Sequence, residues 1–303
     1  MTKTITGCGT ALVTPFAGDA VDHAALKALV EAQIAGGVDF LVPCGTTGES
    51  PTLTDPERVQ VIETVVETAA GRVPIVAGTG TNDTPHSIAM TKAAKAAGAD
   101  ACLAVAPYYN KPTQEGLYRH FRAMIDEGGL PAMLYHIKGR TGISIDVDTI
   151  ARTAEAGGVI GLKETETVDR VTAIRAACDV PIFSGDDGLT WPMMALGAVG
   201  VVSVASNVLP GEVSAMVGAA KAKDMDAALG LHDLLAPLFR TLFLEPNPQP
   251  VKAALAMRGV IQDDACRLPM ITCGDAVRAE LEHVLAPFCL LYTSDAADEH
   301  RDV

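Results

Sequence analysis

Short apolar runs recur eight times in the first two thirds of the chain, and most are followed by a segment with a helical pattern. Such runs are typical of strands that are buried on both faces of a parallel sheet. They lie at residues 10–14, 39–44, 73–78, 101–105, 131–136, 158–164, 180–184 and 200–204. Strand–helix units repeated eight times predict an α/β fold, the (β/α)8 TIM barrel. An open doubly wound sheet is disfavoured because no Gly-x-Gly-x-x-Gly turn follows the first run.

The connecting segments carry helix start signals, such as Asp22 and Thr54 at N-cap positions. Beyond about residue 224 the strand pattern stops, and only helical patterns follow. These helical stretches lie near 225–244, 250–260 and 274–286. The sequence therefore predicts a barrel over residues 1–224 and a C-terminal three-helix appendage over residues 225–288.

The last stretch, residues 289–303, changes abruptly from apolar residues to small and acidic ones. Chain ends of this kind are often disordered, so we expect a disordered tail. We also hypothesise that this tail is not native sequence. Deleting it should leave the melting temperature and the activity unchanged.

Composition disfavours several classes of protein. The chain has 303 residues and a formal net charge of −14, which argues against binding to nucleic acid or to an anionic membrane. Its seven cysteines show no Cys-x-x-Cys spacing, so neither a zinc cage nor a disulfide framework is predicted. No stretch approaches the roughly 18 apolar residues that span a bilayer, and the N-terminus lacks the pattern of a signal peptide. We therefore expect a soluble, cytoplasmic protein.

The sixth apolar run delivers a lysine, Lys163, at its end. In a parallel barrel the carboxyl ends of the strands form the rim where active sites are built. Burial favours the neutral form of an amine, and a neutral lysine there can attack a ketone. On residue type alone, a lysine at a strand end more often simply reaches solvent. The chemical interpretation therefore depends on what surrounds it.

Polar groups follow three of the other runs. The glycine-rich turn Gly45–Ser50 offers hydroxyls and free backbone N–H groups that suit a carboxylate, although an ordinary polar loop has the same composition. Tyr108 and Tyr109 follow the fourth run, in a place where aromatic residues more often pack than react. Tyr135 ends the fifth run, and Arg140 lies just beyond it.

Together these groups predict an imine-forming site. An amine that attacks a carbonyl needs a proton carrier beside it, and Tyr135 with Thr47 as its hydroxyl partner can relay the proton. Arg140 can hold a second carboxylate through two hydrogen bonds. We infer that a small 2-oxo acid binds to Lys163 as an imine and then attacks a second substrate as its enamine.

The sequence resembles the pyruvate-dependent class I aldolase superfamily that includes N-acetylneuraminate lyase, and within it the dihydrodipicolinate synthase family. The resemblance runs from about residue 5 to about residue 287. It rests on the motifs Gly45–Ser50, Pro107–Gly116, Tyr135 with Arg140–Gly142, Gly161–Glu164, Ser184–Asp187 and Glu245–Lys252.

This resemblance implies condensation of pyruvate with L-aspartate 4-semialdehyde, the first committed step of lysine biosynthesis through diaminopimelate. Lys163 would be the Schiff-base lysine and Tyr135 the proton relay. Thr47 would assist the relay, as would Tyr109 reaching in from a neighbouring subunit. No metal and no organic cofactor is implied, because the lysine itself is the electron sink.

The resemblance also implies how the substrates are held. Thr46 and Thr47 would hold the pyruvate carboxylate, and Arg140 the carboxylate of the semialdehyde. Gly185 and Val202 would line the pyruvate pocket through their backbones. The family is usually a homotetramer, a dimer of dimers, in which Tyr109 is shared across the tight dimer.

One loop departs from the family pattern. The family usually has Asn-Val-Pro after the relay tyrosine, whereas this chain reads His136-Ile137-Lys138. Lys138 is a rival nucleophile by position, but it lies past the strand end, so burial favours Lys163. We expect His136 to be packed or hydrogen-bonded. The altered loop leaves open another pyruvate-dependent aldolase or lyase of the same superfamily.

The residues that bind the feedback inhibitor lysine in the family are only partly present in this chain. Ser50, Asn82 and Tyr108 fit that site, but His86 stands where feedback-inhibited enzymes carry a glutamate. Asp55 and Arg58 replace its histidines. A histidine cannot supply the anion that an ammonium group needs, so we predict weak or absent inhibition by lysine.

A non-catalytic protein that binds 2-oxo acids is the alternative from a different class. Such a protein would tolerate loss of the nucleophile or of the relay. Lys163, Tyr135, Thr47 and Tyr109 are all present together, which favours an enzyme.

Overall fold

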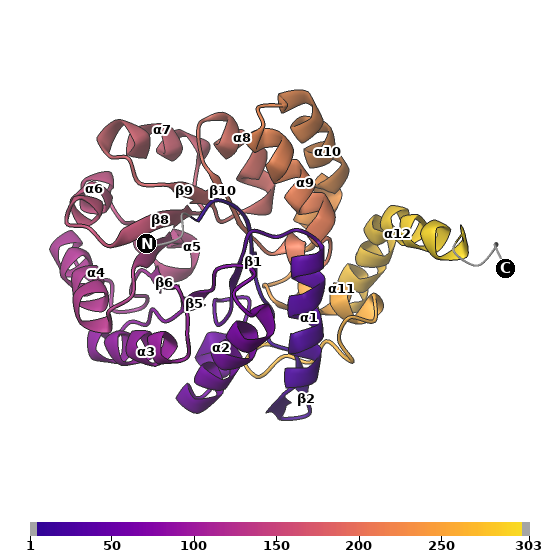
Figure 1. Ribbon diagram of the computed structural model, residues 1–303, viewed down its shortest axis with the longest axis horizontal. Coiled ribbons are helices and arrows are strands. Elements are labelled where there is room, and N and C mark those ends of the chain that lie inside the picture. Colours follow the sequence, from indigo (N-terminus) through magenta and orange to yellow (C-terminus); the bar gives the residue numbers. More distant parts are fainter. Residues whose placement is uncertain (1–4, 299–303) are drawn as a thin grey trace.

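The computed structural model describes residues 5–298, with side chains up to residue 288, and shows a barrel of parallel strands surrounded by helices (Figure 1). The strands are hydrogen-bonded in the order β4-β1-β10-β9-β8-β7-β6-β5, and a parallel bridge between Leu41 and Ile75 links β4 to β5. The strands are β1 (Gly7–Ala11), β4 (Phe40–Val42), β5 (Val76–Gly78), β6 (Ala101–Val105), β7 (Ala132–His136), β8 (Val159–Glu164), β9 (Ile182–Ser184) and β10 (Gly200–Ser203). The predicted barrel is confirmed.

The first strand lies three residues earlier than the apolar run at 10–14 predicts. The reason is a close approach between neighbouring strands. A Cβ on Gly9 would lie 2.2 Å from the Phe40 ring, and one on Gly7 would lie 1.9 Å from the Asp39 carboxylate. Glycine in a strand often marks such a contact, which an apolar run does not reveal.

Helices follow the strands and cover the outside of the barrel (Figure 1). Their starts match the sequence signals, since Asp22 caps α1 and Thr54 forms a capping box with Glu57 at α2. The helices are α1 (His23–Ala35), α2 (Asp55–Ala69), α3 (Thr84–Ala96), α4 (Gln114–Gly128), α5 (Lys138–Thr141), α6 (Val147–Glu155), α7 (Val168–Ala177), α8 (Thr190–Ala195) and α9 (Pro210–Lys221). A small hairpin, β2 (Phe16–Ala17) with β3 (Ala20–Val21), precedes α1.

The C-terminal segment contains α10 (Met225–Thr241), α11 (Gln249–Met257) and α12 (Asp275–Asp298). These helices lie close to the three predicted stretches, on the α1 and α9 side of the barrel (Figure 1). The backbone of α12 remains helical to Asp298, beyond the end near residue 286 that the sequence predicts, because Pro287 does not end the helix. Of the tail predicted to be disordered, residues 289–298 are therefore helical, and residues 299–303 lie outside the described residues. Whether the tail is native stays a prediction.

The barrel interior is a packed apolar cluster. Phe40 and Phe183 meet edge to face, with ring centres 5.5 Å apart. Val202 and Tyr135 belong to the same cluster, nearer the carboxyl ends of their strands. This packing leaves room for a site only at the rim.

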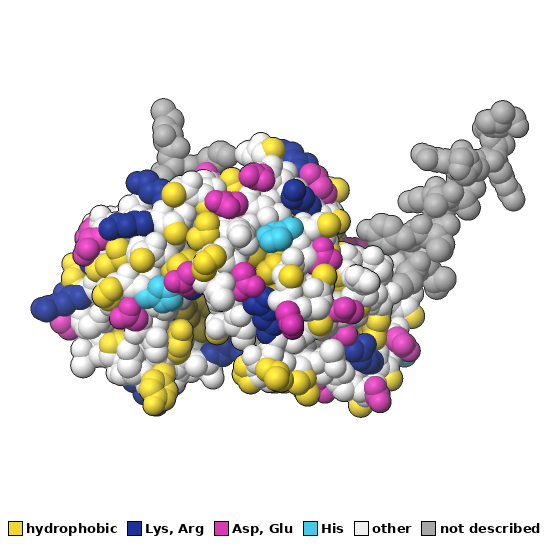
Figure 2. Space-filling view, turned by 90° about the horizontal axis from the view of Figure 1, so that it is seen from below, with side chains coloured by type: hydrophobic (Ala, Val, Ile, Leu, Met, Phe, Trp, Pro, Cys, Tyr) yellow, Lys and Arg dark blue, Asp and Glu magenta, His cyan; other side chains and the backbone are white. Residues whose placement is uncertain are grey.

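The surface agrees with the charge argument. On the face drawn in Figure 2, basic side chains are scattered among acidic ones and do not gather in one patch. None of the helices within residues 5–298 is both long enough and apolar enough to cross a membrane.

Candidate active site

Lys163 and Tyr135 lie side by side at the rim of the barrel. They are register partners on the parallel strands β8 and β7, so both side chains point to the same side of the sheet. Both are buried, with exposed fractions of 5% and 4%. The Lys163 Nζ lies 4.3 Å from the centre of the Tyr135 ring. Among the residues with described side chains, none forms an ion pair with Lys163.

The next strand provides the space that the lysine occupies. A Cβ on Gly185, just after β9, would lie 2.8 Å from the Lys163 Cε and 2.5 Å from the Thr165 Cγ2. The Gly185 N–H donates to the Glu164 carbonyl at 2.6 Å, which holds the backbone against β8. Any larger residue at Gly185 would displace the lysine. Val202 is fully buried in the inner cluster, on β10.

The turn after β4 is held in a tight conformation. Cys44 and Glu49, at its two ends, both have a positive φ, of 57° and 53°. Such strain persists only where neighbouring contacts impose it, and it often marks functional loops. The Thr14 hydroxyl donates to the Gly48 carbonyl at 2.8 Å, fixing the turn to the segment after β1. Thr47 is thereby buried, with 3% of its surface exposed.

Asn247, which the sequence analysis does not single out, joins two of the predicted groups. Its side-chain Nδ2 donates to the Thr47 Oγ1 at 2.9 Å. Its backbone carbonyl accepts from the Arg140 Nη2 at 3.2 Å. Its own Oδ1 is buried without a hydrogen-bond partner. The only signal in the sequence is the position of Asn247 inside the Glu245–Lys252 motif.

A cavity of about 210 Å³ lies beside Tyr135 and Arg140, and neither Lys163 nor Thr47 is part of its lining. It brings together the predicted residues Thr46, Ser50, Tyr108, Tyr135 and Arg140. The rest of its lining consists of Cys44, Gly45, Pro51, Arg58, Gly78, Gly80, Thr81, Leu103, Val105, Ile137 and Thr141. Pockets of this kind, with a few polar groups converging on an apolar wall, are the usual places for small ligands.

Tyr109 does not enter this cavity. Tyr109 is 88% exposed, and its backbone adopts a left-handed conformation with a φ of 70°. The loop is anchored by Asn110, whose Nδ2 donates to the Asn82 carbonyl at 2.8 Å. A single chain therefore leaves Tyr109 outside the site.

The residues of the expected feedback site separate into two places. His86 Nε2 lies 3.0 Å from the Asp55 carboxylate, and both side chains are partly exposed. Ser50 and Tyr108 line the cavity, together with Arg58. His86 and Asn82 are not part of its lining.

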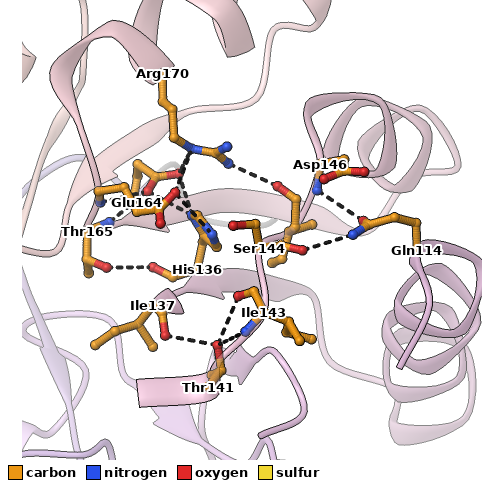
Figure 3. A network of polar contacts seen from close by, with 12 residues as sticks. Gln114, His136, Ile137, Thr141, Ile143, Ser144, Asp146, Glu164, Thr165 and Arg170 are labelled. Carbon is orange, nitrogen blue, oxygen red and sulfur yellow. Dashed lines mark hydrogen bonds and ion pairs between the residues drawn. The ribbon is translucent and has the colours of Figure 1, made fainter. Parts of the chain in front are cut away.

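An ion network lies on the opposite side of β7 and β8 from the nucleophile, since successive side chains of a strand point to opposite faces. Figure 3 shows this network around Glu164 and His136. Its centre is Glu164, which is fully buried and lies 2.8 Å from the Nδ1 of His136. The Arg170 Nε donates to Glu164 at 3.1 Å, and the backbone N–H groups of Thr165 and Glu166 donate at 3.0 and 2.9 Å. Since Glu164 and His136 directly follow Lys163 and Tyr135, this network fixes the two strand ends that carry the reactive side chains. The prediction that His136 is hydrogen-bonded is confirmed.

The charge state of Glu164 follows from this network. Burial alone would raise the pKa of its carboxyl. The hydrogen bond and charge of His136, the Glu166 N–H and the charge of Arg170 outweigh burial and lower the pKa below its usual range. His136, Glu164 and Glu166 are close enough to share a metal ion. Because Arg170 already pairs with both carboxylates, their arrangement suits an internal ion network better than a cation site.

Lys138, the rival nucleophile, lies on α5 and is exposed. Arg140 lies on the same short helix, at the mouth of the cavity. The expectation that Lys138 is solvated and Lys163 is buried is confirmed.

Comparisons with known proteins identify the family. Residues 4–287 match the model of the dihydrodipicolinate synthetase family. The 4-hydroxy-tetrahydrodipicolinate synthase of Pelobacter propionicus is 45% identical over 93% of this chain and 98% of its own length. That of Koribacter versatilis is 47% identical over 96% and 98%. The crystal structure of dihydrodipicolinate synthase from Aquifex aeolicus has a TM-score of 0.92 and 44% identity, covering 94% of this chain and 99% of that one. The chain belongs to the dihydrodipicolinate synthetase family.

Proposed function

We propose that this protein is a 4-hydroxy-tetrahydrodipicolinate synthase, which condenses pyruvate with L-aspartate 4-semialdehyde in the lysine (diaminopimelate) pathway. The observation that carries the proposal is the pair of Lys163 and Tyr135. An amine is buried at the rim of the barrel with a phenol beside it, and no carboxylate among residues 5–288 forms an ion pair with it. Membership of the family and the names of the relatives support the same activity.

The reaction begins with attack of the Lys163 amine on the ketone carbon of pyruvate. The carbinolamine that forms loses water to give the imine, and Tyr135 carries the proton that the departing oxygen needs. Loss of a proton from the methyl group then gives the enamine. Its carbon attacks the aldehyde of the second substrate, forming the new carbon–carbon bond. No metal or organic cofactor enters these steps, because the iminium nitrogen takes up the electrons.

Each substrate carboxylate has its own anchor. The strained turn after β4 presents Thr46 and Thr47 to the pyruvate carboxylate, while Gly185 and Val202 line that pocket through their backbones. Arg140 lies at the mouth of the cavity, where it can hold the carboxylate of the semialdehyde. Asn247 contacts both anchors, at Thr47 and at Arg140.

Tyr109 completes the proton relay only if a neighbouring subunit supplies it. Its exposure of 88% in a single chain supports a position at an interface. We propose a homotetramer, a dimer of dimers, in which Tyr109 reaches into the site of the adjacent chain. Mixing Lys163→Ala subunits with Tyr109→Phe subunits should then restore activity, because one hybrid site has both groups intact. No recovery on mixing would mean that Tyr109 acts within its own chain or not at all.

Regulation by lysine is weak or absent in this proposal. His86 pairs with Asp55 at the surface, so neither acts as a free anion for the ammonium group. Half-inhibition by lysine below the millimolar range would contradict this. The enzyme is proposed to be soluble and cytoplasmic.

Trapping with borohydride tests the chemistry directly. Pyruvate and borohydride should leave one reduced adduct, which peptide mass analysis locates on the peptide carrying Lys163. An adduct on Lys138, or none, would overturn the mechanism and favour a non-catalytic 2-oxo-acid-binding protein. A panel of aldehydes then separates the synthase from another aldolase or lyase of the superfamily, which the altered loop at His136–Gly139 keeps open.

A further inference from the structure

Thr165 directly follows β8, is half-buried and has no part in the proposed reaction. Its hydroxyl donates to the His136 carbonyl at 3.0 Å, which joins the end of β8 to the end of β7 (Figure 3). Its backbone N–H donates to the Glu164 carboxylate at 3.0 Å. A β-branched side chain has few χ1 rotamers, and the hydroxyl bond selects one of them. The Thr165 methyl group is therefore held in one position.

This methyl group lies beside the reactive lysine. A Cβ on Gly185 would lie 2.5 Å from the Thr165 Cγ2 and 2.8 Å from the Lys163 Cε, so both carbons lie next to the same point on the Gly185 backbone. Gly185 is itself fixed, because its N–H donates to the Glu164 carbonyl at 2.6 Å. On the β9 side, the space beside the Lys163 side chain is thus bounded by the Thr165 methyl group and the Gly185 backbone.

The order of the strands indicates which part of the 2-oxo acid meets this boundary. The ring of strands places β4 opposite β8, with β7 on one side of β8 and β9 on the other. In the proposed function, Thr46 and Thr47 hold the pyruvate carboxylate on the β4 side, and Tyr135 occupies the β7 side. A planar imine carbon bonded to the lysine nitrogen and to the carboxylate carbon has one further substituent, the methyl group of pyruvate. The β9 side, with Thr165 and Gly185, is left for that methyl group.

We propose that Thr165 determines the size of the 2-oxo acid that Lys163 accepts. Its methyl group fills the space that one more carbon on the methyl of pyruvate would need. Pyruvate is therefore accepted, and 2-oxobutanoate, which is one carbon longer, is disfavoured. One extra CH2 in a closely fitting apolar pocket typically changes selectivity by about 10- to 200-fold. This selectivity rests on the proposed function, since it belongs to the same imine site.

Two substitutions separate the methyl group from the hydroxyl. Thr165→Ser keeps the hydroxyl bond to His136 and removes only the methyl group, so the preference for pyruvate over 2-oxobutanoate should fall by about tenfold. Thr165→Val keeps the methyl group and removes the hydroxyl, so its preference should stay close to that of the wild type. Thr167→Ser is the control, because Thr167 is exposed and precedes α7.

Competitive trapping measures this preference without any aldehyde. The intact enzyme is treated with borohydride in equal concentrations of pyruvate and 2-oxobutanoate. Mass analysis then gives the ratio of the two reduced adducts, which differ by one CH2, on the peptide carrying Lys163. Melting temperatures of the same variants show how much each substitution affects stability.

The outcomes distinguish a selective threonine from a structural one. A merely structural Thr165 would lower the melting temperature in both variants and leave the adduct ratio as in the wild type, which would overturn the inference. An equal fall of the ratio in Thr165→Ser and Thr165→Val would overturn it too, because the methyl group would then not be the cause. If the wild type forms no adduct on Lys163 with either acid, the proposed function fails and the selectivity fails with it. If the wild type forms the pyruvate adduct and Thr165→Ser keeps the wild-type ratio, only the selectivity fails.

Discussion

Two buried lysines in this protein illustrate opposite uses of the same side chain. Lys252 is fully buried on α11, where its Nζ donates to the Glu49 carboxylate and to the Ala265 carbonyl and lies 4.1 Å from the centre of the Phe16 ring. Lys163 is almost as deeply buried on β8, but it lies against the Tyr135 ring and has no carboxylate partner among the described side chains.

The difference lies in what each lysine is free to do. Glu49 forms an ion pair with Lys252, and the pair joins the C-terminal helices to the strained turn that carries Thr47. Among the described side chains, no carboxylate pairs with Lys163 in this way, and imine formation needs a neutral amine. Burial with a partner makes a structural lysine, and burial without one makes a nucleophile.

Of the substitutions that test this difference between the two lysines, replacing Lys163 should have the largest effect. Lys163→Ala should lower kcat by on the order of 10⁴-fold, equivalent to about 5 kcal/mol, because the covalent intermediate cannot form. The melting temperature should change little, since no ion pair is lost. Lys138→Ala is the control and should retain the borohydride adduct. Steady-state kinetics and circular dichroism melts measure both, and a Lys163→Ala enzyme with a tenth of normal activity would break the comparison.

Breaking the Lys252 pair should have the opposite signature. Lys252→Met or Glu49→Gln alone should lower the free energy of unfolding by about 3–5 kcal/mol, because each leaves one buried charge unpaired. The double variant should lose much less than the sum of the two. Urea unfolding at equilibrium measures the cycle. Additive losses would mean that the two side chains stabilise the protein independently.

The sequence predicts the features that are determined by short, contiguous stretches of residues. Seven of the eight barrel strands lie within a predicted apolar run and the first overlaps one, so the fold follows from counting such runs. Lys163 and Tyr135 are found because each ends its own run. The first strand is predicted three residues too late because apolar Leu12 and Val13 follow it. The strand itself contains Gly7 and Gly9, where a Cβ would clash with side chains at the start of β4.

Contacts between distant segments escape such reasoning. Asn247 meets Thr47 across 200 residues, and Lys252 meets Glu49 across 203. Neither pair leaves a periodic pattern, because only the closed barrel and the C-terminal helices bring the partners together. The role of Tyr109 is different, since it depends on a second chain and is predicted only through the family resemblance.

His120 offers a third solution for a buried group that can carry a positive charge. It is 5% exposed, its Nδ1 lies 2.9 Å from the Thr84 hydroxyl, and burial lowers its pKa to about 4 in spite of the nearby Asp83. The folded pKa is below the unfolded value, so the stability that neutral His120 provides is present above about pH 6.5 and is lost as the pH falls toward 4.

His120→Gln should therefore flatten the fall in stability between pH 6.5 and 4. The difference between variant and wild type should change by up to about 3 kcal/mol across that range, following 1.4 kcal/mol per pKa unit. Urea unfolding at several pH values measures the slope, with exposed His283→Gln as the control. An unchanged slope in His120→Gln would show that the histidine becomes protonated without unfolding.

The smallest effect should come from Asn247, which acts on the reaction only through its neighbours. Asn247→Ala removes the donor to Thr47 but keeps the backbone carbonyl that accepts from Arg140. We expect kcat to fall about tenfold, or about 1.4 kcal/mol, as for the loss of one hydrogen bond. The KM for the semialdehyde should hardly change, since Arg140 keeps its contact.

A cycle with Thr47→Val distinguishes positioning from general damage. If Asn247 acts by orienting the Thr47 hydroxyl, Asn247→Ala should cause no further loss of kcat once that hydroxyl is gone. Independent, multiplying losses in the double variant, or a change confined to KM, would instead assign Asn247 to substrate contact through its unpartnered Oδ1. Either outcome shows whether the C-terminal helices only stabilise the barrel, as Lys252 does, or also tune the relay beside Lys163.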